Sequence, residues 1–229
     1  MKLQFTTLGN HGWSRFELLV VVLLVLFIFC LILAMLMPAR LTLNHRVIRS
    51  QRIQCVSNLK QLALALRIWE GDHNNQYPMH VPVAGGGALE LINTGNVAGC
   101  FQVASNELST PKILFCPADA GRVPAKNFTS DFDNSHISYF LCPDATETFP
   151  KMILSGDDNL AVDSDPVEPG VLDLATNAPV TWTAARHDHA GNIGYADGSV
   201  WEVSGLGLRN ALQNAVQGTP YATNRLAIP

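Results

Sequence analysis

An uninterrupted apolar run near the N-terminus decides how this chain is organised. Residues 18–37 read LLVVVLLVLFIFCLILAMLM, with no charged side chain among them. As an α-helix with a rise of about 1.5 Å per residue, the run spans about 30 Å, the hydrocarbon thickness of a bilayer. A cleaved secretory signal has a shorter apolar region of about 7–15 residues and a cleavage site of small residues. Residues 37–40, MPAR, offer no such site. The run therefore predicts a retained single-pass membrane anchor.

The composition of the whole chain fits an anchored protein. Of the 229 residues, 48% are hydrophobic and 15% are charged, and the net charge is −4. A charged share this low is unusual for a soluble domain. There is no basic excess, so we predict no nucleic-acid partner. The sequence has no P-loop, dinucleotide-binding fingerprint or nucleophile elbow, and we predict that the chain is not an enzyme.

Five cysteines leave the redox state open. One lies in the apolar run, and the other four are Cys55, Cys100, Cys116 and Cys142. These four can form two disulfides in an oxidising compartment, in any pairing, or remain buried thiols. No C-x-x-C pair occurs, which gives little support to a zinc ribbon or a thioredoxin-like site.

A carboxylate at the edge of the apolar run is the unusual local feature. Residues 12–17 read GWSRFE, and Glu17 directly precedes the run. Inside the hydrocarbon a carboxylate costs several kcal/mol unless it finds a partner. The simpler alternative is an interfacial acid at the start of the helix, where a negative charge suits the helix dipole.

The spacing around Glu17 favours a more specific interpretation. The arrangement resembles the signal of type IV prepilins and type II secretion pseudopilins, which has a glycine, a large apolar residue, three further residues, Glu and an apolar helix. The resemblance implies that a prepilin peptidase cuts between Gly12 and Trp13 and N-methylates Trp13. Glu17 would pair with the new ammonium group of a neighbouring subunit during assembly, which fixes the stagger between subunits. Trp13 stands where the family usually has Phe, and Arg15 where an apolar or neutral residue is common.

The helical pattern continues beyond the membrane segment. Apolar residues recur at threes, fours and sevens, as one buried helix face requires: Ile48, Cys55, Leu59, Leu62, Leu66 and Trp69. Gly71 is a natural C-terminal stop. We predict one helix over residues 17–70 whose second half packs on a globular head. Residues 51–62, QRIQCVSNLKQL, resemble a stretch found in a large prepilin-like family.

The rest of the sequence predicts an α+β head with a mainly antiparallel sheet. We expect short helices at residues 88–93, 101–108 and 206–216, and strands at residues 112–116, 136–142 and 152–155. Residues 192–196 and 199–203 flank Asp197-Gly198, which suits a two-residue type I′ hairpin. With the prepilin resemblance, this implies a pilin-like fold of four parts: leader 1–12, transmembrane half-helix 13–38, extramembrane half-helix 39–71 and head 72–229.

The hairpin carries a second resemblance. His187, nine residues and then Asp197-Gly198 match the His-x(9)-Asp-Gly motif of the prepilin-type processing-associated group. His187 and His189 alternate on a segment expected to be extended, so with Asp197 they are candidate zinc ligands. The simpler alternative is that His187 forms a hydrogen bond that locks the turn.

Acidic residues before the hairpin are candidate calcium ligands. Residues 155–159 read SGDDN, and some pseudopilins bind calcium in a C-terminal loop. The EF-hand spacing is absent, and a solvated acidic loop is the simpler interpretation of Asp157 and Asp158. We predict no resident cofactor, with calcium as the alternative.

Together these features predict a structural subunit of a type II secretion-like pseudopilus or a type IV pilus-like filament. Its partners would be the prepilin peptidase, other pilin-like subunits and an assembly platform. We expect the inner membrane, with the N-terminus cytoplasmic and the head periplasmic, although the arginines that follow the run predict the opposite orientation. The alternatives are a membrane-tethered extracytoplasmic ligand-binding module and an anchored metalloenzyme using His187, His189 and Asp197.

Overall fold

The computed structural model describes residues 14–129 and 131–229, without the side chains of residues 36–46. Gly12 and Trp13, the predicted cleavage and methylation residues, lie outside this part. The chain divides into two units, Met1–Val47 and Ile48–Pro229.

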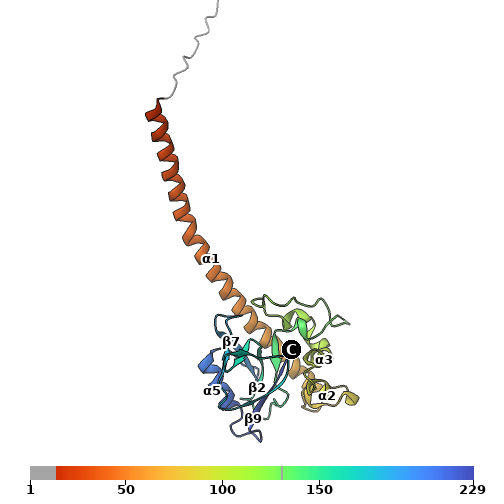
Figure 1. Ribbon diagram of the computed structural model, residues 1–229. Helices are drawn as coiled ribbons and strands as arrows, with labels where there is room; N and C mark the ends of the chain where they lie inside the picture. Colours follow the sequence, from red (N-terminus) through yellow and green to blue (C-terminus); the bar gives the residue numbers. More distant parts are fainter. Residues whose placement is uncertain (1–13, 130) are drawn as a thin grey trace, which may run out of the picture. The chain divides into compact units, whose positions relative to one another are not determined.

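Helix α1 (Arg15–Asp72) contributes to both units (Figure 1). In the first unit, the most apolar part of Arg15–Met35 has a mean hydropathy of 3.6, and none of the side chains of Arg15–Met35 is buried. It is the one helix in the described part of the chain that is long and apolar enough to cross a membrane. Phe27, for example, is 63% exposed. The predicted apolar helix is confirmed, and its length and composition fit a membrane anchor.

The second unit is built on a six-stranded sheet with the order β5-β9-β1-β2-β7-β8, in which every pairing is antiparallel. Its strands are β1 (Tyr139–Leu141), β2 (Ile153–Asp157), β5 (Gly170–Ala175), β7 (Ala190–Tyr195), β8 (Val200–Ser204) and β9 (Thr223–Ile228). A three-stranded sheet has the order β4-β3-β6 and comprises β3 (Leu160–Val162), β4 (Asp165–Pro166) and β6 (Val180–Trp182). The predicted α+β class with a mainly antiparallel sheet is confirmed.

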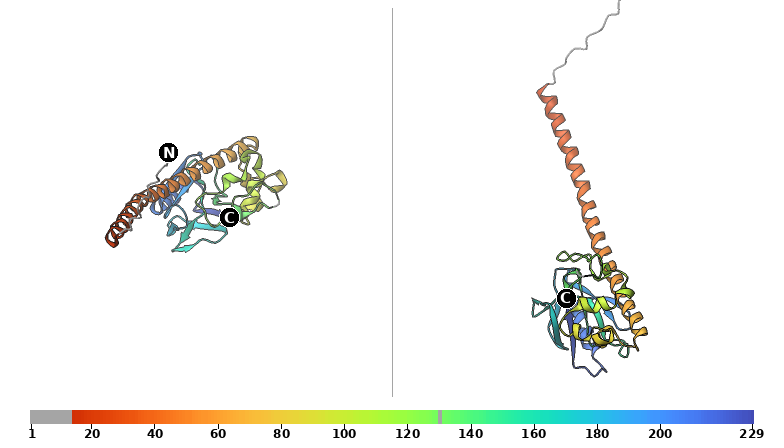
Figure 2. Two further views of the ribbon diagram at one scale, coloured as in Figure 1. Left: turned by 90° about the horizontal axis from the view of Figure 1, so that it is seen from above. Right: turned by 90° about the vertical axis from the view of Figure 1, so that its right-hand side faces the viewer.

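The second half of α1 forms part of the core of this unit. Figure 2 shows it lying along the head. Its buried face includes five residues predicted from their spacing: Cys55, Leu59, Leu62, Leu66 and Trp69. The prediction was wrong for Ile48, which is 45% exposed. Ile48 is the first residue of this unit, so the helix begins to bury its face only later.

Short helices surround the sheet. The α-helices are α2 (Leu89–Ile92), α3 (Val97–Val103), α4 (Ser105–Leu108) and α5 (Gly205–Ala215), and the 3-10 turns are η1 (Pro78–His80), η2 (Val83–Gly85), η3 (Pro111–Leu114) and η4 (Asn134–His136). The helices predicted at residues 88–93 and 206–216 are confirmed with shifted ends as α2 and α5, whereas residues 101–108 are divided between α3 and α4 at Ala104. The strand predicted at residues 112–116 is wrong. Pro111 opens a 3-10 turn there, and Thr110 Oγ1 accepts a hydrogen bond from the Lys112 N–H at 3.4 Å.

Candidate functional site

Glu17 lies in the first turn of α1, where it interacts with the residue that precedes the helix. The Ser14 N–H donates to Glu17 Oε2 at 2.8 Å, and the Glu17 N–H donates to Ser14 Oγ at 3.2 Å. This reciprocal pair is a capping box, which satisfies two otherwise unpaired N–H groups. Glu17 therefore has a local structural role, and any test of a second role must preserve the cap.

The His-x(9)-Asp-Gly motif ends in the hairpin between β7 and β8. The Gly198 N–H donates to the Tyr195 carbonyl and the Tyr195 N–H to the Ser199 carbonyl, both at 2.9 Å. Gly198 has a φ of +84°. The hairpin is confirmed, but its loop has three residues, 196–198, so the predicted two-residue type I′ turn is wrong. Asp197 does not have a positive φ, whereas Gly198 does, which fits a type I turn closed by a left-handed glycine. Asp197 Oδ1 accepts from the Ser199 N–H at 2.8 Å across this loop.

Helix α1 is tied to this hairpin through one side chain. Arg67 Nη1 donates to the Asp197 carbonyl at 3.3 Å, and Arg67 Nε forms an ion pair with Glu147. Gly198 lies close beside Arg67, since a Cβ at Gly198 would come within 3.3 Å of Nη1. The motif thus holds the C-terminal part of α1 against the sheet.

Glu70, one helical turn beyond Arg67, is buried and makes the head sensitive to pH. Burial, helped by the Glu147 charge, raises the pKa of Glu70 from 4.5 to about 7. The folded head binds this proton more tightly than the unfolded chain does. The contribution to stability is therefore present below about pH 4.5 and is lost as the pH rises to about 7.

Replacing Glu70 with Gln should remove this dependence. We expect the melting temperature of the native chain in detergent to fall as the pH is raised through that window, and the Glu70→Gln variant to melt above the native chain at pH 8. The control is Glu168→Gln, at an exposed carboxylate. Equal pH profiles for the native and Glu70→Gln chains would refute the assignment.

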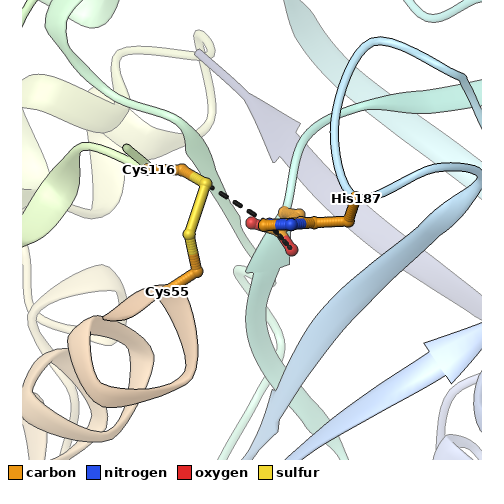
Figure 3. A group of neighbouring side chains, drawn as sticks. Cys55, Cys116 and His187 are labelled. Atoms are coloured by element: carbon orange, nitrogen blue, oxygen red, sulfur yellow. Dashed lines mark hydrogen bonds and ion pairs between the residues drawn. A yellow bond between two sulfur atoms is a disulfide. The ribbon is translucent and has the colours of Figure 1, made fainter. Parts of the chain in front are cut away.

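His187 lies in the interior of the head, next to a disulfide (Figure 3). Its Nε2 is 3.3 Å from Cys116 Sγ and 3.6 Å from Asp157 Oδ2, and Cys116 is bonded to Cys55. Burial lowers the pKa of His187, and the negative charge of Asp157 acts in the opposite direction. Burial also raises the pKa of Asp157. His187 therefore lies between the disulfide, whose Cys55 belongs to α1, and Asp157 at the end of β2.

The backbone around His187 is strained. His187, Asp188 and His189 have φ values of +53°, +53° and +58°. Left-handed non-glycine residues cost about 1–3 kcal/mol each unless the surroundings hold them. Arg52 Nη2 donates to the His187 carbonyl at 2.6 Å and helps to hold this loop. The expected extended alternation of His187 and His189 is therefore wrong.

The two residues predicted to bind zinc together with His187, namely His189 and Asp197, do not lie beside it. His189 Nδ1 lies 3.4 Å from the Trp182 carbonyl, and Asp197 lies in the hairpin loop. Among the described residues, the group of potential ligands around His187 contains Asp157 but neither His189 nor Asp197.

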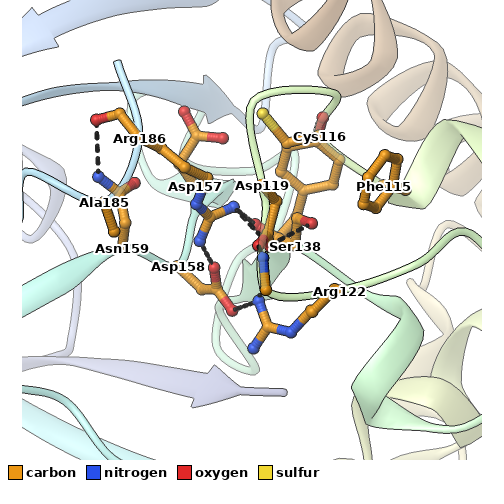
Figure 4. Close-up of polar contacts among 12 residues, drawn as sticks. Phe115, Cys116, Asp119, Arg122, Ser138, Asp157, Asp158, Asn159, Ala185 and Arg186 are labelled. Carbon is orange, nitrogen blue, oxygen red and sulfur yellow. Dashed lines mark hydrogen bonds and ion pairs between the residues drawn. The ribbon is translucent and has the colours of Figure 1, made fainter. Parts of the chain in front are cut away.

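Asp158 belongs to a separate buried ion cluster (Figure 4). Arg186 forms ion pairs with Asp158 and, at 3.4 Å, with Asp119, and its Nη1 donates to the Ser138 carbonyl at 2.9 Å. Arg122 Nη1 lies 2.6 Å from Asp158 and 3.2 Å from Asp119. Burial acts to raise the pKa of Asp119, but Arg186 and its other partners hold it below the usual value. Asp158, one of the two carboxylates considered for calcium, is therefore neutralised by the guanidinium groups of Arg122 and Arg186.

Sequence analysis missed this cluster. Arg186 directly precedes the motif histidine, but Asp119 and Arg122 lie far from it in the sequence, and no spacing links the three. The disulfide pairing was also open. Cys55 and Cys116 are bonded, whereas Cys100 and Cys142 are free buried thiols whose pKa values are raised by burial.

No protein-family model, curated protein or solved structure matches this chain.

Proposed function

We propose that the chain is a prepilin-like, membrane-anchored structural subunit of a type II secretion-like pseudopilus or a type IV pilus-like filament. The observation that carries the proposal is a carboxylate, Glu17, in the first turn of an exposed apolar helix. It follows Gly12 at the spacing of a prepilin cleavage signal. The subunit sits in the inner membrane with its N-terminus cytoplasmic and its head periplasmic.

The physical basis is the pairing of two charges at the membrane. Cleavage after Gly12 creates an ammonium group on Trp13, and Glu17 of a neighbouring subunit can neutralise it. Where water is scarce, opposite charges attract strongly, and a register that leaves either one unpaired is disfavoured. The pair therefore selects the stagger between subunits, while the exposed apolar side chains pack against each other and lipid.

The direct test of processing is mass spectrometry of the mature N-terminus, with the protein expressed in its native host. We expect the chain to begin with N-methyl-Trp13. A chain that retains Met1 or any part of the leader would remove the basis of the proposal.

Two substitutions separate the assembly role of Glu17 from its capping role. Glu17→Gln preserves the capping box because the amide oxygen can still accept from the Ser14 N–H, but it removes the charge. Glu17→Ala removes both. We expect both variants to insert into the membrane normally and both to lose most of their incorporation into filaments, measured by shearing and sedimentation. Normal assembly of Glu17→Gln with defective assembly of Glu17→Ala would show that only the cap matters.

One observation favours the alternative of a tethered ligand-binding module. A hollow of about 650 Å³ lies beside the motif hairpin, and its lining includes Lys151, Tyr195 and Trp201. Trp201 is 63% exposed, and an exposed indole beside a charged group is a common recognition surface. Normal assembly behaviour of both Glu17 variants, combined with loss of envelope-polymer binding in Trp201→Ala, would favour this alternative.

A further inference from the structure

Four potential metal ligands meet in the interior of the head. They are Cys55 on α1, Cys116 after η3, Asp157 at the end of β2 and His187 of the motif. One ligand atom from each lies within 4.8 Å of the other three, and all four residues are buried. They come from four separate stretches of the chain, so the fold itself assembles the group.

The spacing of these atoms suits a tetrahedral ion. With bonds of about 2.3 Å to sulfur and about 2.0–2.2 Å to nitrogen and oxygen, neighbouring ligand atoms of a tetrahedral zinc site lie about 3.3–3.8 Å apart. The observed separations from His187 Nε2 are 3.3 Å to Cys116 Sγ and 3.6 Å to Asp157 Oδ2. The sulfur atoms of Cys55 and Cys116, which are bonded to each other, would need to separate, and the remaining ligand atoms already lie within 4.8 Å of one another.

An incompletely paired carboxylate is a second, independent indication of a cation. Asp157 is fully buried, and its Oδ1 has no hydrogen-bond partner. Its Oδ2 accepts from the Asn192 N–H at 2.7 Å and from Asn192 Nδ2 at 2.8 Å. Such outer hydrogen bonds orient a ligating carboxylate. Asn192 thus orients the carboxylate through Oδ2, the oxygen near His187, and the unpartnered Oδ1 of the same buried group is suited to a positive ion.

We propose that the dithiol form of this chain binds one zinc-class divalent ion through Cys55, Cys116, His187 and Asp157, and that the ion and the Cys55–Cys116 disulfide are alternative states of one site. On binding, the two thiols release two protons to solvent and their sulfurs bind the ion. Disulfide formation instead removes two protons and two electrons, which an external disulfide accepts as it is reduced to two thiols. The thiolate and imidazole ligands favour zinc or cobalt over magnesium or calcium.

The test uses the full chain in detergent micelles with Cys30→Ser, Cys100→Ala and Cys142→Ala, so that only the pair in question remains. The chain is reduced with a phosphine, freed of metal and titrated with Co²⁺ without oxygen. We expect one equivalent to give the visible bands of tetrahedral cobalt and a thiolate charge-transfer band, and Zn²⁺ to displace it. The oxidised chain should show neither band.

Variants identify the ligands. Asp157→Asn and His187→Gln should each weaken cobalt binding about tenfold or more, since loss of even an outer-sphere partner costs about 10–100-fold. His189→Gln, which changes a neighbouring imidazole outside the group, should leave the affinity unchanged. Equal affinity in all three variants, or no thiolate band in the reduced chain, would overturn the proposal.

A second measurement needs no change at Asp157 or His187. An external disulfide is added to the reduced chain with and without prior Zn²⁺, and bridge formation is followed by mass spectrometry. Zinc should slow bridging about tenfold or more if it holds both thiolates. Equal rates would refute the proposal even if a ligand variant failed to fold. Neither result depends on whether the chain assembles into filaments.

Discussion

Replacing Arg186 with Met is expected to lower the free energy of unfolding of the head by about 3–5 kcal/mol. Arg186 is buried, and it neutralises Asp158 while also pairing with Asp119. Met fills similar volume but leaves these carboxylates with Arg122 as their remaining cationic partner within the cluster. The loss arises from uncompensated buried charge, because burying an unpaired carboxylate is far more costly than burying a paired one.

The measurement is urea-induced unfolding of the full chain in detergent, followed by tryptophan fluorescence; urea is preferred because guanidinium would screen the charges. Arg209→Met, on the exposed face of α5, is the matched control and should change stability by less than about 0.5 kcal/mol. Adding Asp158→Asn to Arg186→Met should recover part of the loss. A single variant as stable as the control would show that the cluster contributes little.

Removing the Cys55–Cys116 bridge should cost about 4 kcal/mol by loop-closure entropy, because the bonded residues are 61 positions apart. The bridge joins α1 to the segment that leads into the sheet. Without it, the unfolded chain gains the freedom to separate these two segments. The double variant Cys55→Ala/Cys116→Ala therefore unfolds at lower urea concentration.

The matched control is Cys100→Ala/Cys142→Ala, which removes the same atoms from two buried thiols that form no bridge. Subtracting its effect leaves the contribution of the cross-link. A phosphine reductant, with a chelator present, should destabilise the native chain but not the Cys55→Ala/Cys116→Ala variant. Equal losses in the two double variants would mean that packing, and not the bridge, accounts for the effect.

Local patterns in the sequence predicted the elements whose own residues show helical spacing or a turn motif. The buried face of α1 followed from helical spacing, and the β7–β8 hairpin followed from turn residues between two apolar segments. The sequence analysis did not predict β5 and β9, although they pair over six residues, from Gly170–Ile228 to Ala175–Thr223. Their strand conformation depends on a partner about 50 residues away along the chain, which no local window contains.

The candidate sites also depend on contacts between residues that are far apart in the sequence. Glu17 and the motif residues were singled out from spacing, but His189 and Asp197, the candidate zinc ligands considered with His187, are not in its group of potential ligands. Three successive left-handed residues turn the loop so that His187 points at Asp157 and Cys116. Backbone strain of this kind depends on tertiary contacts such as that from Arg52, and no sequence rule anticipates it.

The position of β9 sets the order in which the head can form. It follows the other strands of this sheet in the described sequence, yet it lies between β5 and β1 and buries Leu226, Ala227 and Ile228. Because β5 pairs with β9 alone, β5 can join the sheet only after residues 223–228 have taken their place. A chain truncated before Thr223 would therefore leave β5 without a neighbour and expose one edge of β1.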